Sequence, residues 1–384
     1  MPRTRSSSVP LVLLFVASVV FSASADAQQN PDGRLPIGDT DDPLVWLIRD
    51  PYVLDRIEAT DEQRRAFREL ADRIDSSIWP ARNRPAADAQ RAWREATELA
   101  QREIESRLKP DQRHEFYGIL YRVLGPRGLE RPDLADRLEL TAEQRQQVAE
   151  LLASGRRELA SLQQRREQGE AIETLQREAT ESTERVRKEL LEQLTVAQRT
   201  DWSKLLGESI DFAQLGAIDF AAPPLPADPN DWIGRPPPQG YGESPVTVIH
   251  FFAHGCINCR RNYERYREWD AAYRDRGVRV VGIHTPETEE ERDRSLLERR
   301  IAEAKFEFPV LVDGRSEQWN RWGNSMWPTV YLVDRQGRVR GWWIGELQWQ
   351  GQTGDQAIAR RIETLLAEDA AKPGGTSPPS GRRP

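Results

Sequence analysis

Residues 246–260 read Val246-Thr-Val-Ile-His-Phe-Phe-Ala-His-Gly-Cys256-Ile-Asn-Cys259-Arg260. The first seven residues are β-branched or aromatic, the composition of a buried strand. After the cysteines, the apolar residues Ile257, Tyr263, Tyr266, Trp269 and Tyr273 recur at helical spacing, which predicts an amphipathic helix that ends at Gly277. The two cysteines are the only ones in the chain, so any thiol chemistry is confined to this junction of strand and helix.

The pattern downstream of this helix predicts the rest of one domain. The rest of this domain is predicted to contain strands at 278–283, 308–312, 329–333 and 339–344, helices at about 289–304 and 353–367, and a hairpin turn at Asp334-Arg-Gln-Gly337. We therefore expect an α/β domain with a central mixed sheet flanked by helices, over residues 246–367. Strand, helix, strand, helix, antiparallel hairpin and helix is the order of a thioredoxin-like domain.

A Cys-x-x-Cys pair at the start of a helix has a defined chemistry. Free backbone N–H groups and the helix dipole favour an anion at the first sulfur, which lowers the pKa of that thiol. The second sulfur lies one turn further and can resolve a mixed disulfide. We assign Cys256 as the nucleophile and Cys259 as the resolving residue, with Arg260 adding positive charge beside them. This redox-active pair needs no diffusible organic cofactor and no metal.

Several motifs resemble one subfamily of thioredoxin-like proteins. They are Cys256-Ile-Asn-Cys259, His284-Thr-Pro-Glu287, Trp327-Pro328, Tyr331-Leu-Val-Asp334 and Gly345-Glu346. In this order they resemble the thioredoxin-like domain of DipZ-type proteins, in the broader TlpA/redoxin group, over about residues 228–367. The resemblance implies an exported thiol–disulfide oxidoreductase, whose partners are client proteins with disulfides or thiols and an upstream redox protein.

The resemblance also implies a substrate-binding element at Trp327-Pro328. In this fold the proline at this position, just before a strand, is in the cis form and faces the cysteine pair. Because Pro328 has no N–H, the residue before it can present its backbone to an extended peptide. We expect Trp327 and Pro328 to bind the substrate.

Two positions depart from the pattern of thioredoxins. Gly255 stands where thioredoxins commonly have Trp, and His250 stands where they often bury an Asp that helps to deprotonate the resolving cysteine. One hypothesis makes His250 a proton relay, because imidazole exchanges protons near neutral pH. The alternative is a buried neutral histidine that is hydrogen-bonded to a backbone group.

The first half of the chain has a different pattern. Residues 43–207 are rich in Arg, Glu, Gln, Leu and Ala, with apolar residues at helical spacing, which predicts a helical domain. Thr60-Asp-Glu-Gln63, Thr141-Ala-Glu-Gln144 and Thr195-Val-Ala-Gln198 have the pattern of capping boxes, and Pro110 fits a first helical position. Their order predicts two hairpin-like repeats, and "LTAEQR" weakly resembles the LTxxQ motif of exported helical-hairpin proteins of the Spy/CpxP kind. The lone His114 of this region is expected to be solvated.

The remaining segments are predicted to be a signal peptide, a linker and a C-terminal tail. Arg3 and Arg5 precede an apolar run at 9–21 and small residues up to Ala27, so residues 1–27 are interpreted as a signal peptide. The protein is then periplasmic or extracellular, and soluble after cleavage. Residues 208–245 contain many prolines and predict a stiff linker, and residues 368–384 predict a disordered tail.

Composition excludes some classes of function. The chain has 384 residues, 55 Lys and Arg against 62 Asp and Glu, and a net charge of −7. This balance excludes an integral membrane protein and gives no general reason to expect nucleic-acid binding. A peroxidase would need a Pro-x-x-x-Thr-x-x-Cys pattern, which the sequence lacks.

Two alternatives to thiol–disulfide exchange remain open. The side chains of His250, His254, Cys256, Cys259 and His284 suit copper or zinc, which would make the domain a thioredoxin-fold metal-binding protein. In the second alternative the redox domain is vestigial, and the helical region works as a binding or oligomerisation module.

Overall fold

The computed structural model describes residues 29–30, 42–81, 86–216, 220–238 and 240–371. The described chain divides into two compact units: residues 42–63 with 103–215, and residues 64–102 with 216–371 and the short segment 29–30. The predicted signal peptide lies outside the described residues, as does the tail beyond residue 371. Among the residues that the structure describes, no helix combines the length and apolar composition needed to span a membrane.

The first unit is helical, as the sequence predicts. His114 is exposed on α6, as expected. The α-helices of this unit are α2 (Leu44–Leu47), α3 (Pro51–Arg56), α6 (Pro110–Leu124), α7 (Pro132–Arg137), α8 (Ala142–Glu167), α9 (Ile172–Glu192) and α10 (Val196–Leu205). The 3₁₀ turns η3 (Gly125–Glu130) and η4 (Phe212–Gln214) complete it.

The predicted capping boxes are present, and the glutamine of each one binds a second glutamine at the start of another helix. Thr60 Oγ1 accepts the N–H of Gln63, and Thr141 and Thr195 do the same for Gln144 and Gln198. The amides then pair across helices. Gln63 Nε2 donates to Gln112 Oε1 (2.9 Å) and Gln112 Nε2 donates back (3.1 Å).

The second repeat contains the same amide pair. Gln144 Nε2 donates to Gln198 Oε1 (2.8 Å), and Gln198 Nε2 donates to Gln144 Oε1 (3.1 Å). Each amide also donates its second hydrogen to a backbone carbonyl, as from Gln63 to Arg107 and from Gln144 to Gln193. In each half of the helical region, the start of one helix is therefore tied to the start of another.

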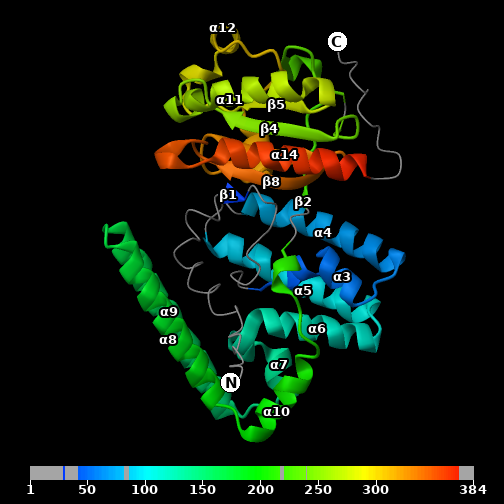
Figure 1. Ribbon diagram of the computed structural model, residues 1–384, viewed down its shortest axis with the longest axis vertical. Helices are drawn as coiled ribbons and strands as arrows, with labels where there is room; N and C mark the ends of the chain where they lie inside the picture. Colours follow the sequence, from blue (N-terminus) through cyan, green and yellow to red (C-terminus); the bar gives the residue numbers. More distant parts are fainter. Residues whose placement is uncertain (1–28, 31–41, 82–85, 217–219, 239, 372–384) are drawn as a thin grey trace, which may run out of the picture. The chain divides into compact units, whose positions relative to one another are not determined.

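Helices α8 and α9 form a long antiparallel hairpin within the first unit (Figure 1). A Cβ added at Gly155 of α8 would lie 3.2 Å from Val186 Cγ2 of α9, so the glycine permits close approach of the two helices. Further along, Leu162 packs with Leu175 and Ala179, which are fully buried. A narrow apolar seam thus holds the two charged helices together.

The second unit is built around one mixed sheet. Its strand order is β1-β8-β7-β4-β5-β6-β3, and β2 also pairs with β8. Parallel pairing joins β4 to β5 and β5 to β6, whereas β7 and β8 are antiparallel to their neighbours. The strands are β1 (Gln29–Asn30), β2 (Phe220–Ala221), β3 (Trp232–Ile233), β4 (Val246–Phe252), β5 (Arg279–His284), β6 (Val310–Val312), β7 (Thr329–Asp334) and β8 (Arg338–Ile344).

Helices pack against this sheet, and its central strand β4 is buried over its whole length. Val246, Val248 and Phe252 share a core with Tyr266 of α11 and Ile358 of α14. In Figure 1, α11 and α14 run alongside the strands of this unit. The helices after β3 are α11 (Ile257–Tyr273), α12 (Arg294–Glu303), α13 (Glu317–Arg321) and α14 (Gly354–Ala370), with 3₁₀ turns η6 (Arg274–Arg276), η7 (Glu290–Arg292) and η8 (Trp349–Gly351).

The alternate residues of β4 meet a second aromatic group. Phe251 packs edge-on against Trp319 of α13, Trp322 and Tyr331 of β7, with ring centroids 5.8–6.1 Å apart. Because successive strand residues point to opposite faces, both faces of β4 are covered. The element order and the mixed sheet confirm the predicted thioredoxin-like fold.

Residues 208–245 do more than connect the two regions. Their strand β2 pairs with β8, and β3 pairs with β6, so this segment extends the sheet at both ends. A 3₁₀ turn, η5 (Pro229–Asp231), lies between them. At the other end of the domain, α14 continues to Ala370, three residues past the predicted end of the helix.

The second unit also takes in two helices from the predicted helical region. These are α5 (Ala86–Arg107) and α4 (Asp61–Ala81), both of which cross the division between the units. Asp72 of α4 forms an ion pair with Arg338 of β8, and Asp75 Oδ2 accepts the N–H of Ala221. The sequence boundary at residue 207 therefore does not coincide with the division between the compact units.

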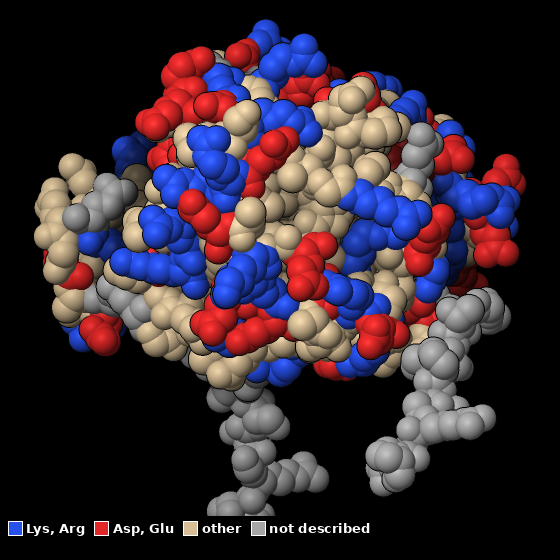
Figure 2. All heavy atoms as spheres, turned by 90° about the horizontal axis from the view of Figure 1, so that it is seen from above, with Lys and Arg blue, Asp and Glu red and all other residues tan. Residues whose placement is uncertain are grey.

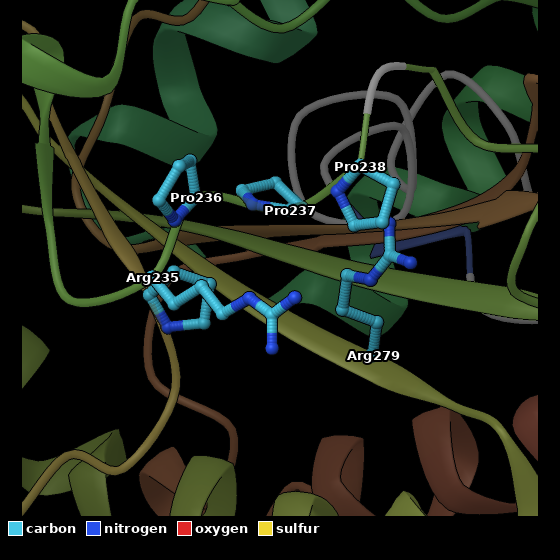
Figure 3. Close-up of a pocket in the computed structure, with 6 residues that line it drawn as sticks. Arg235, Pro236, Pro237, Pro238 and Arg279 are labelled. Carbon is cyan, nitrogen blue, oxygen red and sulfur yellow. The ribbon is translucent and has the colours of Figure 1, made fainter.

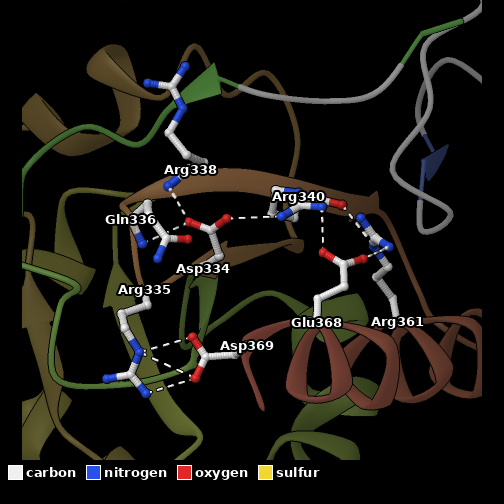
Figure 4. A network of polar contacts seen from close by, with 8 residues as sticks. All are labelled: Asp334, Arg335, Gln336, Arg338, Arg340, Arg361, Glu368 and Asp369. Carbon is white, nitrogen blue, oxygen red and sulfur yellow. Dashed lines mark hydrogen bonds and ion pairs between the residues drawn. The ribbon is translucent and has the colours of Figure 1, made fainter. Parts of the chain in front are cut away.

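An ion-pair network ties the β7–β8 hairpin to α14 (Figure 4). Asp334 Oδ1 accepts the N–H groups of Gln336 and Arg338 and so shapes the predicted turn, in which Gly337 has a φ of 73°. Arg340 bridges Asp334 and Glu368, at 3.0 and 2.8 Å. On the face seen in Figure 2, acidic and basic side chains are interspersed, and neither kind forms a large patch of one charge there.

Candidate active site

The cysteine pair lies where the sequence places it, between β4 and α11. Cys256 is the N-cap residue of α11, with φ −66° and ψ 117°, and Cys259 lies in the first turn. The side chain of Cys256 is half-buried, whereas that of Cys259 is completely buried. Both thiols are free in this structure. Only the first sulfur is therefore accessible to a protein substrate.

The surroundings of the two thiols shift their pKa values in opposite directions. The pKa of Cys256 is lowered to about 7, chiefly by the hydrogen bond from the Cys259 thiol and also by the backbone N–H groups of Cys259 and Asn258. Burial and the charge of Glu287 oppose this shift. Burial raises the pKa of Cys259, so that its proton stays in place while Cys256 ionises.

The Trp327–Pro328 peptide bond is cis, as predicted. Trp327 stacks on Trp319 with ring centroids 4.0 Å apart, and Thr329 Oγ1 donates to the carbonyl of Met326. Trp327 and Cys256 are both partly buried and pack against the same hydrophobic core. The expected substrate element and the nucleophile thus both border the core of the thioredoxin-like domain.

One exposed apolar side chain adjoins the nucleophile in sequence, and another adjoins Trp327. Ile257, directly after the nucleophile, has 56% of its surface exposed, and Met326, directly before Trp327, has 42% exposed.

Glu291, which the sequence analysis did not single out, lies against the loop before the nucleophile. Its side chain is buried, and its Oε1 accepts the N–H of Gly255 at 3.0 Å. Its Oε2 accepts the N–H of Glu287 at 2.9 Å. A Cβ at residue 255 would overlap Glu291 Oε1, so any side chain at this position would have to displace the carboxylate.

His250 occupies an aromatic cage. It stacks on Tyr266 and Phe252 and meets the edges of Phe306 and Phe308. Burial lowers its pKa to about 3, and neither ring nitrogen has a hydrogen-bond partner among the described residues. The ring is therefore neutral near pH 7, in line with the second hypothesis, but the backbone partner expected there is absent from the described structure.

Comparison with known proteins agrees with this geometry. Residues 239–341 match the AhpC/TSA family. The C-terminal region is a thioredoxin-like domain of this family. Over 129 residues the chain is 34% identical to protein DipZ of Mycobacterium bovis. These residues make up 34% of this chain and 17% of DipZ. The chain thus spans about a sixth of that relative's length.

Two further relatives are shorter. Thiol-disulfide oxidoreductase YkuV of Bacillus subtilis is 28% identical over 130 residues, which is 34% of this chain and 82% of YkuV. The solution structure of a thioredoxin-like protein in the oxidized form is 25% identical, with a TM-score of 0.33, and covers 38% of this chain and 96% of its own. The match to YkuV therefore spans most of that protein.

The residues of the metal-binding alternative do not converge in the described structure. His254 and His284 stack with ring centroids 5.3 Å apart, but His250 is enclosed by aromatic rings. Across the described ranges, no three His, Cys, Asp or Glu side chains are grouped so as to hold a metal ion. The donor set proposed from the sequence therefore does not form a coordination site here.

A pocket of about 480 Å³ lies at the other end of the strands of the thioredoxin-like domain (Figure 3). Its lining includes Arg235, Pro236 and Arg279. Arg279 pairs with Thr247 at the start of β4, whereas Phe252, close to the cysteines, ends that strand. Five strand residues span roughly 16 Å, so this pocket is separate from the thiol site.

Proposed function

We propose that the thioredoxin-like domain exchanges dithiol for disulfide with client proteins, with Cys256 as the nucleophile and Cys259 as the resolving residue. The observation that carries this proposal is the asymmetry of the pair. Cys256 is accessible and has a pKa of about 7, whereas Cys259 is buried and has a raised pKa. The name of YkuV, a thiol-disulfide oxidoreductase, supports the same reaction.

The reduction of a client proceeds in two steps. The Cys256 thiolate attacks one sulfur of a client disulfide, and the other client sulfur leaves as a thiolate. The Cys259 thiol then loses its proton and attacks the Cys256 sulfur, which releases the second client thiolate. The protein ends with a Cys256–Cys259 disulfide, and the client has gained two electrons and two protons. An upstream dithiol protein restores the reduced pair, and no diffusible cofactor enters the cycle.

The surface around Trp327 and Pro328 binds the client protein. A proline in this position leaves the carbonyl and N–H of the preceding residue available to an extended peptide, and Ile257 and Met326 supply exposed apolar contacts. The helical first unit is proposed as a client-binding or oligomerisation module that supports this exchange. The reaction is placed in the periplasm or outside the cell, where residues 1–27 would direct the chain.

Insulin reduction with dithiothreitol as electron donor tests the reaction. Cys256→Ser is expected to abolish the activity, and Cys259→Ser is expected to accumulate mixed disulfides with clients. Full activity in both variants would overturn the assignment. The mass of the mature protein, recovered from the periplasm of a bacterial host, tests export; retention of residues 1–27 on a cytoplasmic product would contradict it.

A further inference from the structure

Glu291 has a buried carboxylate whose two oxygens hold two different segments of backbone. Its side chain is 5% exposed. Oε1 accepts the N–H of Gly255 and Oε2 accepts the N–H of Glu287. Its contact with His284 Nε2, at 3.9 Å, is with a ring that burial keeps neutral, with a pKa of about 3. A buried carboxylate is costly unless it is hydrogen-bonded, so these two N–H groups are the main compensation seen for its burial.

The two segments follow neighbouring parallel strands. Phe252 and His284, the last residues of β4 and β5, are register partners, and Thr285 N–H donates to the Phe252 carbonyl at 3.0 Å. The chain after β4 leads to Gly255 and then directly to Cys256, and the chain after β5 leads to Glu287. The carboxylate of Glu291 therefore links the loop that carries the nucleophile to the loop beside it.

This link has a close steric fit at Gly255. A Cβ at residue 255 would overlap Glu291 Oε1, so the carboxylate and the bare backbone of the glycine occupy complementary space. Cys256, the next residue, is the N-cap of α11 in an extended backbone conformation, and the N–H groups of Asn258 and Cys259 lower the pKa of its thiol. A displacement of the preceding residue would carry the sulfur away from these donors.

We propose that Glu291 is a positioning residue for thiol–disulfide exchange, which holds the backbone before Cys256 so that the thiolate sulfur faces the N-terminal N–H groups of α11. The catalytic part of this inference rests on the proposed function, but the positioning of the sulfur does not. It can be measured on the protein alone.

A charge effect must be separated from a positioning effect. The groups that face the Cys256 sulfur or lie near its loop include the Cys259 thiol, the Glu287 carboxylate, and the stacked rings of His254 and His284. The negative charge of Glu287 raises the pKa of Cys256, and the side chain of Glu287 is exposed. Glu287→Gln is therefore the matched control, since it removes a nearby charge and leaves the backbone N–H that binds Glu291.

The test is the pH dependence of alkylation of reduced protein by iodoacetamide, in the full chain. Glu291→Gln and Glu291→Ala should move the midpoint for Cys256 upward by about one pH unit, because the sulfur loses its alignment with N–H donors. Glu287→Gln should not raise the midpoint. Insulin reduction by Glu291→Gln should show a kcat about tenfold lower, with KM changed by less than about twofold. A wild-type midpoint in both Glu291 variants would overturn the proposal.

Gly255→Ala provides a second approach that does not depend on Glu291→Ala folding well. Alone, it should raise the midpoint as the Glu291 variants do. Combined with Glu291→Ala, it should add little, because the overlapping carboxylate is gone. A fully additive effect would overturn the proposal. If the wild-type protein does not reduce insulin but the alkylation midpoint moves in the Glu291 variants, the proposed function fails and the positioning role stands. If the wild-type protein is active and the midpoints of these variants do not move, the proposed function stands and the positioning role fails.

Discussion

The ring of His250 lies face to face with the ring of Tyr266, with centroids 4.0 Å apart and planes inclined by 17°. This contact places an imidazole in the aromatic core of the domain, at the position where thioredoxins often bury an Asp. Burial lowers the pKa of His250 to about 3, so the ring is a poor proton acceptor near neutral pH. Its role in the domain can be tested through both activity and stability.

His250→Leu should leave the pH dependence of disulfide exchange unchanged between pH 6 and 9, because a neutral ring takes no part in proton transfer there. The measurement is the rate of insulin reduction across this range. A profile that changes shape in the variant would instead support the relay hypothesis, which stays a prediction until then.

The same residue should make the protein less stable in acid. The pKa of His250 is lower in the folded state than in the unfolded chain, so the unfolded state binds the extra proton and stability falls as pH drops from about 6.5 toward 3. Between pH 7 and pH 5 the loss attributable to this residue is about 2 kcal/mol. Urea unfolding at both pH values should show a smaller loss in His250→Leu, and His114→Gln, an exposed histidine, should behave as wild type.

The thiol of Cys259 should itself be needed for the reactivity of Cys256. Its hydrogen bond is the largest cause of the lowered pKa of Cys256. Cys259→Ala should therefore shift the alkylation midpoint of Cys256 from about 7 toward the ordinary value for a thiol, near 8.5. The decrease in thiolate at pH 7 should slow alkylation severalfold. A midpoint that stays near 7 would show that the backbone N–H groups suffice.

The paired amides of the helical unit should stabilise it cooperatively. Gln144→Ala removes the side-chain acceptor of both the Thr141 N–H and Gln198 Nε2, so we expect a loss of about 1–2 kcal/mol. Because the two amides depend on each other, adding Gln198→Ala should cost less than it does alone. Urea unfolding of the single and double variants measures this coupling. Gln146→Ala, on an exposed side chain of the same helix, is the control; additive losses would contradict the pairing.

The sequence predicts most of the C-terminal fold because its signals are local. The run Val246–Phe252 has the exact extent of β4, and the apolar spacing after Cys256 predicts α11 to within its first and last turns. The capping boxes at Thr141 and Thr195 are equally local and are confirmed. Short edge strands have no such signal, since β2 and β3 are two residues long and lie in a proline-rich segment.

Long-range contacts explain what the sequence did not predict. Glu291 ends an acidic run from Glu287 in which nothing local distinguishes the buried carboxylate from the exposed ones; the glycine at 255 was the available signal. Likewise, the composition of residues 64–102 matches that of the rest of the helical region. Their grouping with the sheet depends on pairs such as Asp72 with Arg338, which are remote in sequence.

Trp327 should contribute to client binding and not to the chemistry of the thiol. It stacks on Trp319 and packs against the core that also contacts Cys256, directly before the cis proline. Trp327→Ala should raise the KM for insulin severalfold, because an aromatic contact with the client is lost, and should change kcat less. Alkylation of Cys256 by iodoacetamide should keep its wild-type midpoint, since a small reagent needs no peptide-binding surface.

A midpoint that shifts together with KM would show that Trp327 acts on the sulfur itself, and an unchanged KM would remove it from the binding surface. Phe212→Ala, which removes an exposed ring in the first unit, is the control for loss of apolar surface.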